Sequence, residues 1–495
     1  MKSALPALLL LAALTGCSGA HHDPAQEAPA AASALRQTGR WFTDAQGRAV
    51  ILHGVNITTP QTADGADLAA RYGDDADFLA AQGFNVVRLA IFLSGLAPTP
   101  NGFDESYLAP VAALVQRLTA AGLYVIVDFH QDLYSTKYHG RGMAEWMAVD
   151  NGLPNLPDAG NLFLNYADNP AVQRAFDNFW SDADAPDGVS LQTHYAQALQ
   201  HVARRFQDNP RVLGYEIMNE PFPGSQFLSC ASPAGCPLFD LLSLTRFVRN
   251  MSTALRAVDA EKILFYEPNV TFDFGANTWL GSSRDPNAGF SFHDYCLADQ
   301  FGALPVDDSA CGPVGEQPQF GYALAHAQRA GAAPILTEFG MFTASADFDT
   351  GPVVRRLAAL ADGEMVSWAY WHYDGASSYT LVADPEQSPA GVNLYANIVD
   401  AVVRPYPRAV AGTPLAFSFD PDTRTFTLDY TPFAAVGGGT LAPALPTELA
   451  VPARVYPHGY VLSVTGGQVV DDGSAAPKIL AAAAATAVHV SILPR

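Results

Sequence analysis

Basic residues are scarce in this chain. Of its 495 residues, 27 are lysine or arginine and 49 are aspartate or glutamate, which gives a formal net charge of −22. A field of this sign repels nucleic acid phosphates and anionic membrane surfaces, so it argues against binding to either through a basic patch. The composition indicates a globular protein with an acidic surface and no nucleic-acid partner.

Long hydrophobic runs are lacking too. The apolar stretch from Ala4 to Leu14 follows Lys2 and is too short for a permanent transmembrane helix, which is typical of a secretory signal. The segment that ends at Cys17, Leu-Thr-Gly-Cys, resembles the bacterial lipobox, and Ser18 favours outer-membrane sorting. The resemblance implies a lipoprotein signal peptide at 1–17 and membrane contact through a lipid on Cys17.

The predicted protein is therefore exported and lipid-anchored to the bacterial outer membrane or cell surface. The alternative is a chance cysteine beside an ordinary cleavage site, which would leave a soluble secreted or periplasmic protein. Residues 18–38, rich in alanine, proline and histidine at first, are expected to be a flexible tether.

Cysteine is rare, and apart from Cys17 the chain contains Cys230, Cys236, Cys296 and Cys311. An even number of cysteines in an oxidising compartment invites pairing, and the short spacings favour Cys230 with Cys236 and Cys296 with Cys311. No cluster of histidine and cysteine with ligand spacing accompanies them, which argues against a zinc site.

Apolar, β-prone segments alternate with amphipathic runs through most of the chain. The helical period is clearest at Val111, Leu114, Val115 and Leu118, and Gly122 follows in the position that ends a helix. The alternation favours a (β/α)8 barrel at 39–411 over an open sheet. A hairpin at 40–47 is expected to cap its bottom. The predicted strands are 50–57, 85–91, 123–130, 212–218, 262–267, 289–295, 333–339 and 365–373.

Residues 412–495 lose the helical period and show short alternating strands, which predicts an antiparallel β-sandwich. Strands are expected at 415–420, 423–430, 453–459, 460–467 and 485–493. Packing against the barrel, carbohydrate contact and membrane approach are all open as roles. The long, aromatic-rich loop at 131–187 either shapes a substrate cleft or packs into a core of its own.

Two strands end in a glutamate. The run VLGYEIMNEP at 212–221 stops at Asn219 and Glu220, followed by a proline that cannot continue a ladder, and APILTEFG at 333–340 contains Glu338. The C-terminal ends of parallel strands in a barrel converge on one face. Two glutamates at that face are what a carboxylate-pair glycosidase needs.

Other strand ends also carry polar or aromatic groups. Glu216 has the same strand parity as Glu220 but lies deeper, where a structural ion pair is expected, and Glu267 is a competing carboxylate. The remaining candidates are Arg88, His130, Asp132, His293, Tyr295 and Trp371.

These motifs resemble the retaining glycosidases of glycoside hydrolase family 5, the cellulase family. The resemblance covers 53–56 (HGVN), Arg88, His130, the Asn-Glu-Pro motif, 293–295 (HDY), 338–340 (EFG) and Trp371. Within that family, three further segments are similar to the endoglycoceramidases, which release an intact glycan from ceramide and carry a C-terminal β-sandwich. They are 128–135 (DFHQDLYS), 174–180 (RAFDNFW) and 405–412 (PYPRAVAG).

The resemblance implies that Glu220 is the acid/base and Glu338 the nucleophile. Retention requires two carboxyls about 5 to 5.5 Å apart, one protonated and one ionised. Arg88 and the hydroxyl of Tyr295 are expected to lower the pKa of Glu338, whose charge should in turn raise the pKa of Glu220.

The supporting roles concern the sugar. Asn219 is placed to bind its 2-hydroxyl, His130 and Asp132 to hold other hydroxyls, and Trp371 to offer an apolar platform, while His293 orients the acid/base. No metal or organic cofactor is needed.

We therefore predict a monomeric retaining β-glycosidase that cleaves a glucose-linked glycan from ceramide. The alternatives are a β-glucosidase, a glucosylceramidase or an endo-β-glucanase with the same mechanism. A non-catalytic carbohydrate-binding surface protein would be expected to lack Glu220 or Glu338, and both are present. A glycolipid enzyme should combine a polar pocket with an apolar trough, whereas a polysaccharide enzyme should have an open groove.

Overall fold

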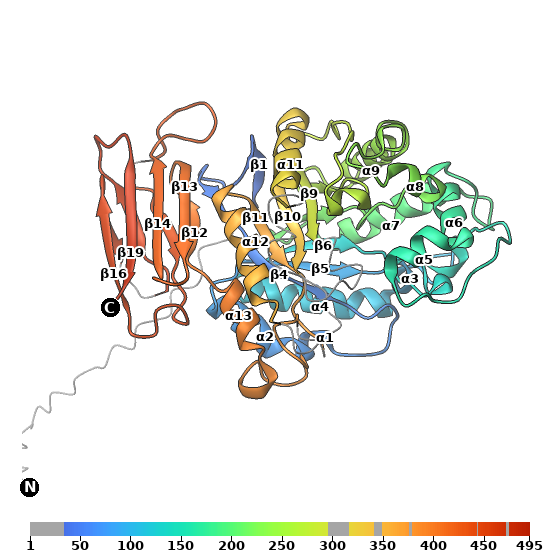
Figure 1. The fold of residues 1–495 in the computed structure, drawn as a ribbon, viewed down its shortest axis with the longest axis horizontal. Helices are drawn as coiled ribbons and strands as arrows, with labels where there is room; N and C mark the ends of the chain where they lie inside the picture. The colour runs from blue at the N-terminus through green and yellow to red at the C-terminus, as the bar shows by residue number, and fades with distance from the viewer. Residues whose placement is uncertain (1–33, 296–315, 341–348, 376–378, 443, 472–474) are drawn as a thin grey trace, which may run out of the picture. The chain divides into compact units, whose positions relative to one another are not determined.

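The computed structural model describes residues 34–295, 316–340, 349–375, 379–442, 444–471 and 475–495 (Figure 1). Cys17 and most of the predicted tether lie outside these residues, as do Cys296 and Cys311. The end of the predicted tether is structured, because Arg36–Thr38 forms strand β1. Cys230 and Cys236 form a disulfide. In the described part of the chain, no helix combines the length and apolarity needed to cross a membrane.

Parallel strands close into the predicted barrel, in the order β10-β11-β4-β5-β6-β7-β8-β9. Nearly every residue of these strands is buried, which explains why the strands read as apolar runs with few polar interruptions. The barrel strands are β4 (His53–Thr58), β5 (Val86–Ile91), β6 (Tyr124–Phe129), β7 (Val212–Glu216), β8 (Ile263–Tyr266), β9 (Ala288–Tyr295), β10 (Ala333–Gly340) and β11 (Ser367–Tyr370).

Helices surround the barrel, and α4 shows how the sequence specifies them. Asp104 caps its start by accepting a hydrogen bond from the backbone N–H of Ser106, its apolar stripe is buried, and Gly122 follows its end with φ +93°. The helices are α1 (Leu68–Arg71), α2 (Gly73–Ala81), α3 (Leu93–Leu96), α4 (Glu105–Ala120), α5 (Leu162–Asp168), α6 (Pro170–Trp180), α7 (Leu191–Phe206), α8 (Phe227–Cys230), α9 (Thr245–Arg256), α11 (Gln317–Ala330), α12 (Gly351–Gly363) and α13 (Ala396–Val402).

The C-terminal part forms two antiparallel sheets around a second core. The smaller has the order β13 (Thr413–Asp420), β14 (Thr425–Thr431), β19 (Val488–Pro494) and β16 (Tyr460–Thr465). The larger has the order β1, β2 (Trp41–Thr43), β3 (Ala49–Val50), β12 (Tyr406–Val410), β15 (Thr447–Ala450), β18 (Lys478–Ala481) and β17 (Gly467–Asp471).

The strand predicted at 453–459 is wrong. This segment forms turns instead, in which Val455 donates its backbone N–H to Pro452 and Gly459 donates to Tyr456. Pro452 and Pro457 lack backbone donors and Gly459 has φ +85°, so the segment cannot continue a ladder. Strands β15, β17 and β18 were not predicted as separate elements.

The N-terminal hairpin caps the bottom of the barrel, as predicted. Phe42 packs in one cluster with Val86, Ile126 and Ile263. These three residues lie in the N-terminal halves of barrel strands β5, β6 and β8. The hairpin also has a second role, because β3 pairs with β12 and so places β1–β3 in the larger C-terminal sheet. The larger C-terminal sheet therefore combines strands that are far apart in sequence.

Candidate active site

The two predicted catalytic glutamates meet at the mouth of the barrel. Glu220 follows β7 and Glu338 lies on β10, and both line a cavity of about 420 Å³. Its other lining residues are Thr58, His130, Asp132, Arg141, Leu162, Phe163, Tyr166, Phe227, Val270, Phe274, Tyr295, Trp371, His372 and Tyr379. Three predicted site residues do not line the cavity but contact its glutamates or one another from behind: Arg88, Asn219 and His293. The structure therefore brings all the predicted site residues of the barrel together.

His293 lies between the two carboxyl groups. Its Nδ1 atom is 2.9 Å from Oε1 of Glu220 and 3.7 Å from Oε2 of Glu338. Burial lowers the pKa of His293 to about 4, so the imidazole is neutral near pH 7. Two carboxyls this close to one nitrogen suit the short separation of a retaining pair, about 5 to 5.5 Å.

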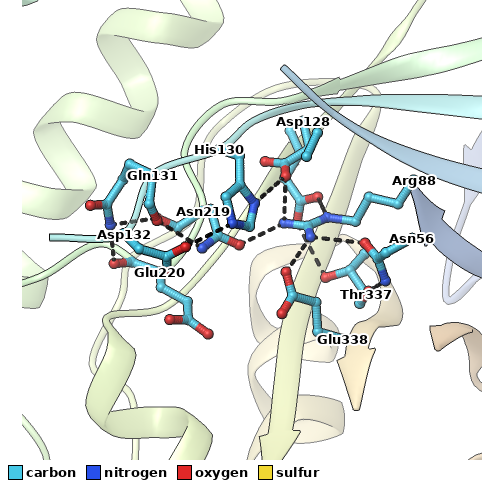
Figure 2. Close-up of polar contacts among 12 residues, drawn as sticks. Asn56, Arg88, Asp128, His130, Gln131, Asp132, Asn219, Glu220, Thr337 and Glu338 are labelled. Atoms are coloured by element: carbon cyan, nitrogen blue, oxygen red, sulfur yellow. Dashed lines mark hydrogen bonds and ion pairs between the residues drawn. The ribbon is translucent and has the colours of Figure 1, made fainter. Parts of the chain in front are cut away.

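Arg88 fixes the charges behind the cavity (Figure 2). Its fully buried guanidinium donates to Glu338 through Nη1 and to Glu216 through Nε, and Nη2 donates to Oδ1 of Asn219 at 2.8 Å. Nη2 also lies 3.1 Å from Asp128 and 3.3 Å from Glu267. The structural ion pair predicted for Glu216 is thus confirmed, with Arg88 as the partner.

Glu338 departs from the expected electrostatics. Burial raises the pKa of this carboxyl above its usual value, although the charge of Arg88 acts in the opposite direction. The expected lowering is wrong because the loss of solvent outweighs the nearby cation. Tyr295 donates its hydroxyl to Oε2 of Glu338 at 2.8 Å, which orients the carboxylate and favours its ionised form.

Glu220 has the raised pKa that an acid/base needs. Burial is the main cause and the charge of Asp132 adds to it, so the pKa reaches about 7. Burial and Asp132, and not the expected charge of Glu338, are thus the main causes that raise this pKa. At neutral pH, a carboxyl with this pKa is protonated in a large fraction of the molecules. It can then give its proton to a leaving oxygen.

The backbone of Glu220 is held in an uncommon conformation. Its φ is +41°, which non-glycine residues rarely adopt, and its N–H donates to Oε2 of Glu267 at 2.9 Å. The Gln131 amide donates to the carbonyl oxygens of Asn219 and Glu220, at 3.0 Å each. Glu267, the competing carboxylate, therefore lies where it positions the acid/base.

A polar wall with an aromatic platform faces the glutamates. His130 stacks on Trp371, with ring centroids 5.3 Å apart and planes at 10°. Arg141 lies 5.4 Å from the Trp371 ring centroid and donates to Oδ2 of Asp132 at 2.5 Å. Burial acts to lower the pKa of His130, but the charge of Asp128 outweighs it and raises the value to about 9. These groups offer hydrogen bonds and a ring face to a sugar.

Asp273 was missed by sequence reasoning. It lies on the short 3₁₀ turn Val270–Phe274 after β8, and its carboxylate faces Glu220 and His293 within 4.8 Å. Burial, then the charge of Glu220, raises the pKa of Asp273 well above its usual range, which favours the protonated form of this carboxyl. A turn residue lacks the signal of a strand end, and the same holds for Arg141 in the loop after β6. Asp128 lies within β6 and was not predicted as a site residue, although its side chain contacts Arg88 and His130.

Two groups of carboxylates with His293 in the described part of the site have a geometry that could hold a cation. They are Glu216 with Glu267 and His293, and Glu220 with Asp273 and His293. Arg88 lies beside both carboxylates of the first set, and burial raises the pKa of Asp273 in the second, which disfavours the ionised carboxylate that a cation needs. We assign no metal to either.

Glu220→Gln is expected to stabilise the protein at high pH. The ordinary glutamate pKa is near 4.5 and the folded value is about 7, so ionising Glu220 in the folded state costs about 3 kcal/mol. That cost is absent below pH 4.5, grows between pH 4.5 and 7, and is complete above pH 7. Thermal unfolding should therefore show equal stability of variant and wild type at pH 4 and a more stable variant at pH 8. Parallel curves at all pH values would contradict the raised pKa.

A second, apolar cavity of about 430 Å³ adjoins the catalytic one. Phe163, Phe227 and Phe274 line both. We name this cavity the trough; its other lining residues are Leu164, Ala167, Leu228, Ala231, Ser232, Pro233, Thr271, Gly275 and Ala276. The trough contains no charged side chain, in contrast to the cavity that holds the glutamates.

Comparison with known proteins agrees with this arrangement. The model of the cellulase family, glycosyl hydrolase family 5, matches residues 43–377, and that of the glycoside hydrolase family 5 C-terminal domain matches 404–492. Endoglycoceramidase I of Rhodococcus hoagii (strain 103S) is 33% identical over 448 residues, which cover 88% of this chain and 83% of the relative.

Solved structures show the same similarity. Endo-glycoceramidase II from Rhodococcus sp. as its lactosyl-enzyme intermediate has a TM-score of 0.74 and 28% identity, covering 92% of this chain and 99% of that chain. Its complex with ganglioside GM3 has a TM-score of 0.74 and 27% identity, covering 92% of this chain and 100% of that chain. This chain therefore belongs to the cellulase family, glycosyl hydrolase family 5, and is a retaining glycoside hydrolase related to the endoglycoceramidases.

Proposed function

We propose that the protein hydrolyses the β-linkage between an oligosaccharide and ceramide in glycosphingolipids. The observation that carries this proposal is the trough beside the catalytic cavity. Phe163, Phe227 and Phe274 line both cavities, so a sugar beside Glu220 and Glu338 would have an apolar space next to it. This is the combination expected of a glycolipid enzyme, because the acyl and sphingoid chains need an apolar surface.

In the first step, Glu338 attacks the anomeric carbon and the bond from that carbon to the ceramide oxygen breaks. Glu220 gives its proton to this oxygen, so ceramide leaves as an alcohol and the glycan forms an ester with Glu338. In the second step, Glu220 takes a proton from water, the water oxygen attacks the anomeric carbon, and the ester bond breaks. The glycan leaves with its β-configuration retained.

The remaining residues support these two steps. Arg88 and Tyr295 orient Glu338 for attack, and His293 and Glu267 hold Glu220 toward the leaving oxygen. The sugar is expected to carry positive charge in the transition state, and the ionised carboxylate of Glu338 would stabilise that charge.

Ala231→Trp tests the trough directly. Ala231 is an exposed trough residue, so a larger side chain fills the apolar space without disturbing the core. We expect kcat/KM for lactosylceramide to fall about tenfold, a loss on the scale of burying one large apolar side chain. Hydrolysis of a soluble aryl β-lactoside, measured in parallel, should be unchanged. Equal losses on both substrates would contradict a role of the trough in binding ceramide.

We also propose that the protein is exported and lipid-anchored through Cys17. The Leu-Thr-Gly-Cys motif after an apolar stretch supports this proposal. Metabolic labelling with a radioactive fatty acid should mark the wild type and not Cys17→Ser. Equal labelling of both proteins would contradict it. A monomeric state remains a prediction.

A further inference from the structure

The segment between Phe222 and Thr245 is unusual for so acidic a chain. Its only charged residue is Asp240, and this carboxylate is fully buried. It accepts hydrogen bonds from the side chain of Asn269 at 2.7 Å and from the backbone N–H of Trp279 at 2.8 Å. The exposed surface of this segment therefore carries no charge.

Large apolar side chains occupy that surface instead. The exposed fractions are 71% for Leu228, 69% for Leu238, 51% for Leu241 and 65% for Leu242, and Trp279 is 46% exposed. A single exposed leucine is ordinary on a soluble protein, but a group of this kind marks an interaction site. We name these residues, together with Leu164, the apolar rim.

Specific contacts hold the members of the rim together. The disulfide between Cys230 and Cys236 joins the segment of Leu228 to that of Leu238, with a Cα–Cα distance of 4.5 Å. The indole N–H of Trp279 donates to the carbonyl of Ala234 at 2.7 Å, and its backbone is bonded to Asp240 beside Leu241. The rim is thus a fixed surface.

The rim is continuous with the trough. Leu164 and Leu228 belong to both, being exposed to solvent and lining the apolar cavity. They come from α5 and α8, which Figure 1 draws near each other at one end of the barrel. Apolar surface therefore extends from outside the protein into the trough, which shares three phenylalanines with the cavity that holds the glutamates.

We propose that the apolar rim docks the protein onto an electrically neutral lipid surface. This inference rests on the proposed function, because the rim leads to the trough. The partner is lipid with zwitterionic or uncharged headgroups, since the rim offers no cation and the net charge of −22 repels anionic headgroups. Exposed leucines and a tryptophan are the side chains that insert at the boundary of headgroups and acyl chains.

The test compares two matched triple variants made in the full chain with Cys17→Ser, so that no acyl anchor contributes. The first, Leu238→Ser, Leu241→Ser and Leu242→Ser, alters the rim. The control, Leu415→Ser, Val461→Ser and Leu493→Ser, removes similarly exposed side chains from β13, β16 and β19. Thermal unfolding shows whether both remain folded.

Binding is measured by sedimentation with phosphatidylcholine vesicles that contain no substrate, so the result does not depend on activity. We expect the rim variant to bind about tenfold more weakly and the control to bind like the parent. Adding anionic phosphatidylglycerol should weaken binding of the parent. Equal binding of both variants, or binding that rises with the anionic fraction, would overturn the proposal.

Activity provides the second measurement. On lactosylceramide in phosphatidylcholine vesicles, the rim variant should lose about tenfold in kcat/KM, while its hydrolysis of a soluble aryl lactoside should equal that of the parent. If the parent binds vesicles through the rim but cleaves no glycosphingolipid, the proposed function fails and the docking surface stands. If it cleaves vesicle lactosylceramide equally well with and without the rim leucines, the docking surface fails and the function stands.

Discussion

Replacing Glu338 with glutamine is expected to abolish turnover of every β-glycoside substrate. Glutamine keeps the shape, and its one oxygen can still accept from Arg88, but its NH2 group cannot accept the hydroxyl hydrogen of Tyr295 and the amide cannot attack the anomeric carbon. We therefore expect kcat to fall by a factor on the order of 10⁴ or more. Steady-state kinetics on lactosylceramide and on a soluble aryl lactoside would measure this loss. Most of the folding free energy comes from the burial of apolar side chains, which this substitution leaves unchanged. The variant should therefore unfold at a temperature close to that of the wild type.

Chemical rescue identifies the role more specifically. In Glu338→Gly, azide can enter the space left by the carboxylate and attack the anomeric carbon, which should restore turnover of an aryl lactoside and yield the α-glycosyl azide. Glu267→Gln is the matched control, since Glu267 also contacts Arg88 but only positions Glu220. No azide adduct with Glu338→Gly, or an adduct with the control, would contradict the assignment of the nucleophile.

Replacing Glu220 with glutamine should produce a loss that depends on the leaving group. Ceramide needs a proton to leave, so kcat/KM for lactosylceramide should fall by roughly 10² to 10⁴. A dinitrophenyl lactoside needs none, so formation of its glycosyl-enzyme should be nearly unaffected and the intermediate should accumulate. A burst of dinitrophenol followed by slow turnover would show this.

The pH dependence of kcat/KM tests the role of Glu220 independently. With a pKa of about 7, Glu220 of the wild type loses its proton as pH rises, and kcat/KM for lactosylceramide should decrease above pH 7. Glu220→Gln cannot titrate, so this decrease should be absent from its residual activity. The same decrease in wild type and variant would assign the titration to another group.

Much of the barrel follows from pattern alone. Buried parallel strands are apolar on both faces, so their runs stand out, and a glutamate at the end of such a run can only lie at the mouth. The strand ends of β7 and β10 therefore located Glu220 and Glu338 without any three-dimensional information. Glu216 was placed correctly by strand parity, because side chains two positions apart share a face.

Other features depend on contacts that no local pattern encodes. Asp273 faces Glu220 from a turn, and the direction of the pKa of Glu338 depends on how completely the fold excludes water. Strand β12 lies within the range assigned to the barrel but pairs with β3 and β15, a long-range pairing with no signal in either segment.

The long loop after β6 shows both expected behaviours. Tyr134, Phe176 and Phe179 are fully buried and form the local core that was one alternative, while Phe163 and Tyr166 line the catalytic cavity as the other alternative required. Aromatic composition predicts that such a loop packs, but which ring faces the substrate is decided by tertiary structure.

The central claim is that this enzyme cleaves between an intact glycan and ceramide. The most direct measurement is product analysis after incubation with detergent-dispersed lactosylceramide and, in parallel, with a soluble β-glucan, using Glu338→Gln as the blank. We predict free lactose and ceramide from the first substrate and little release of sugar from the second. Cleavage of the glucan with lactosylceramide left intact, or release of single sugars from the glycan end, would contradict the account.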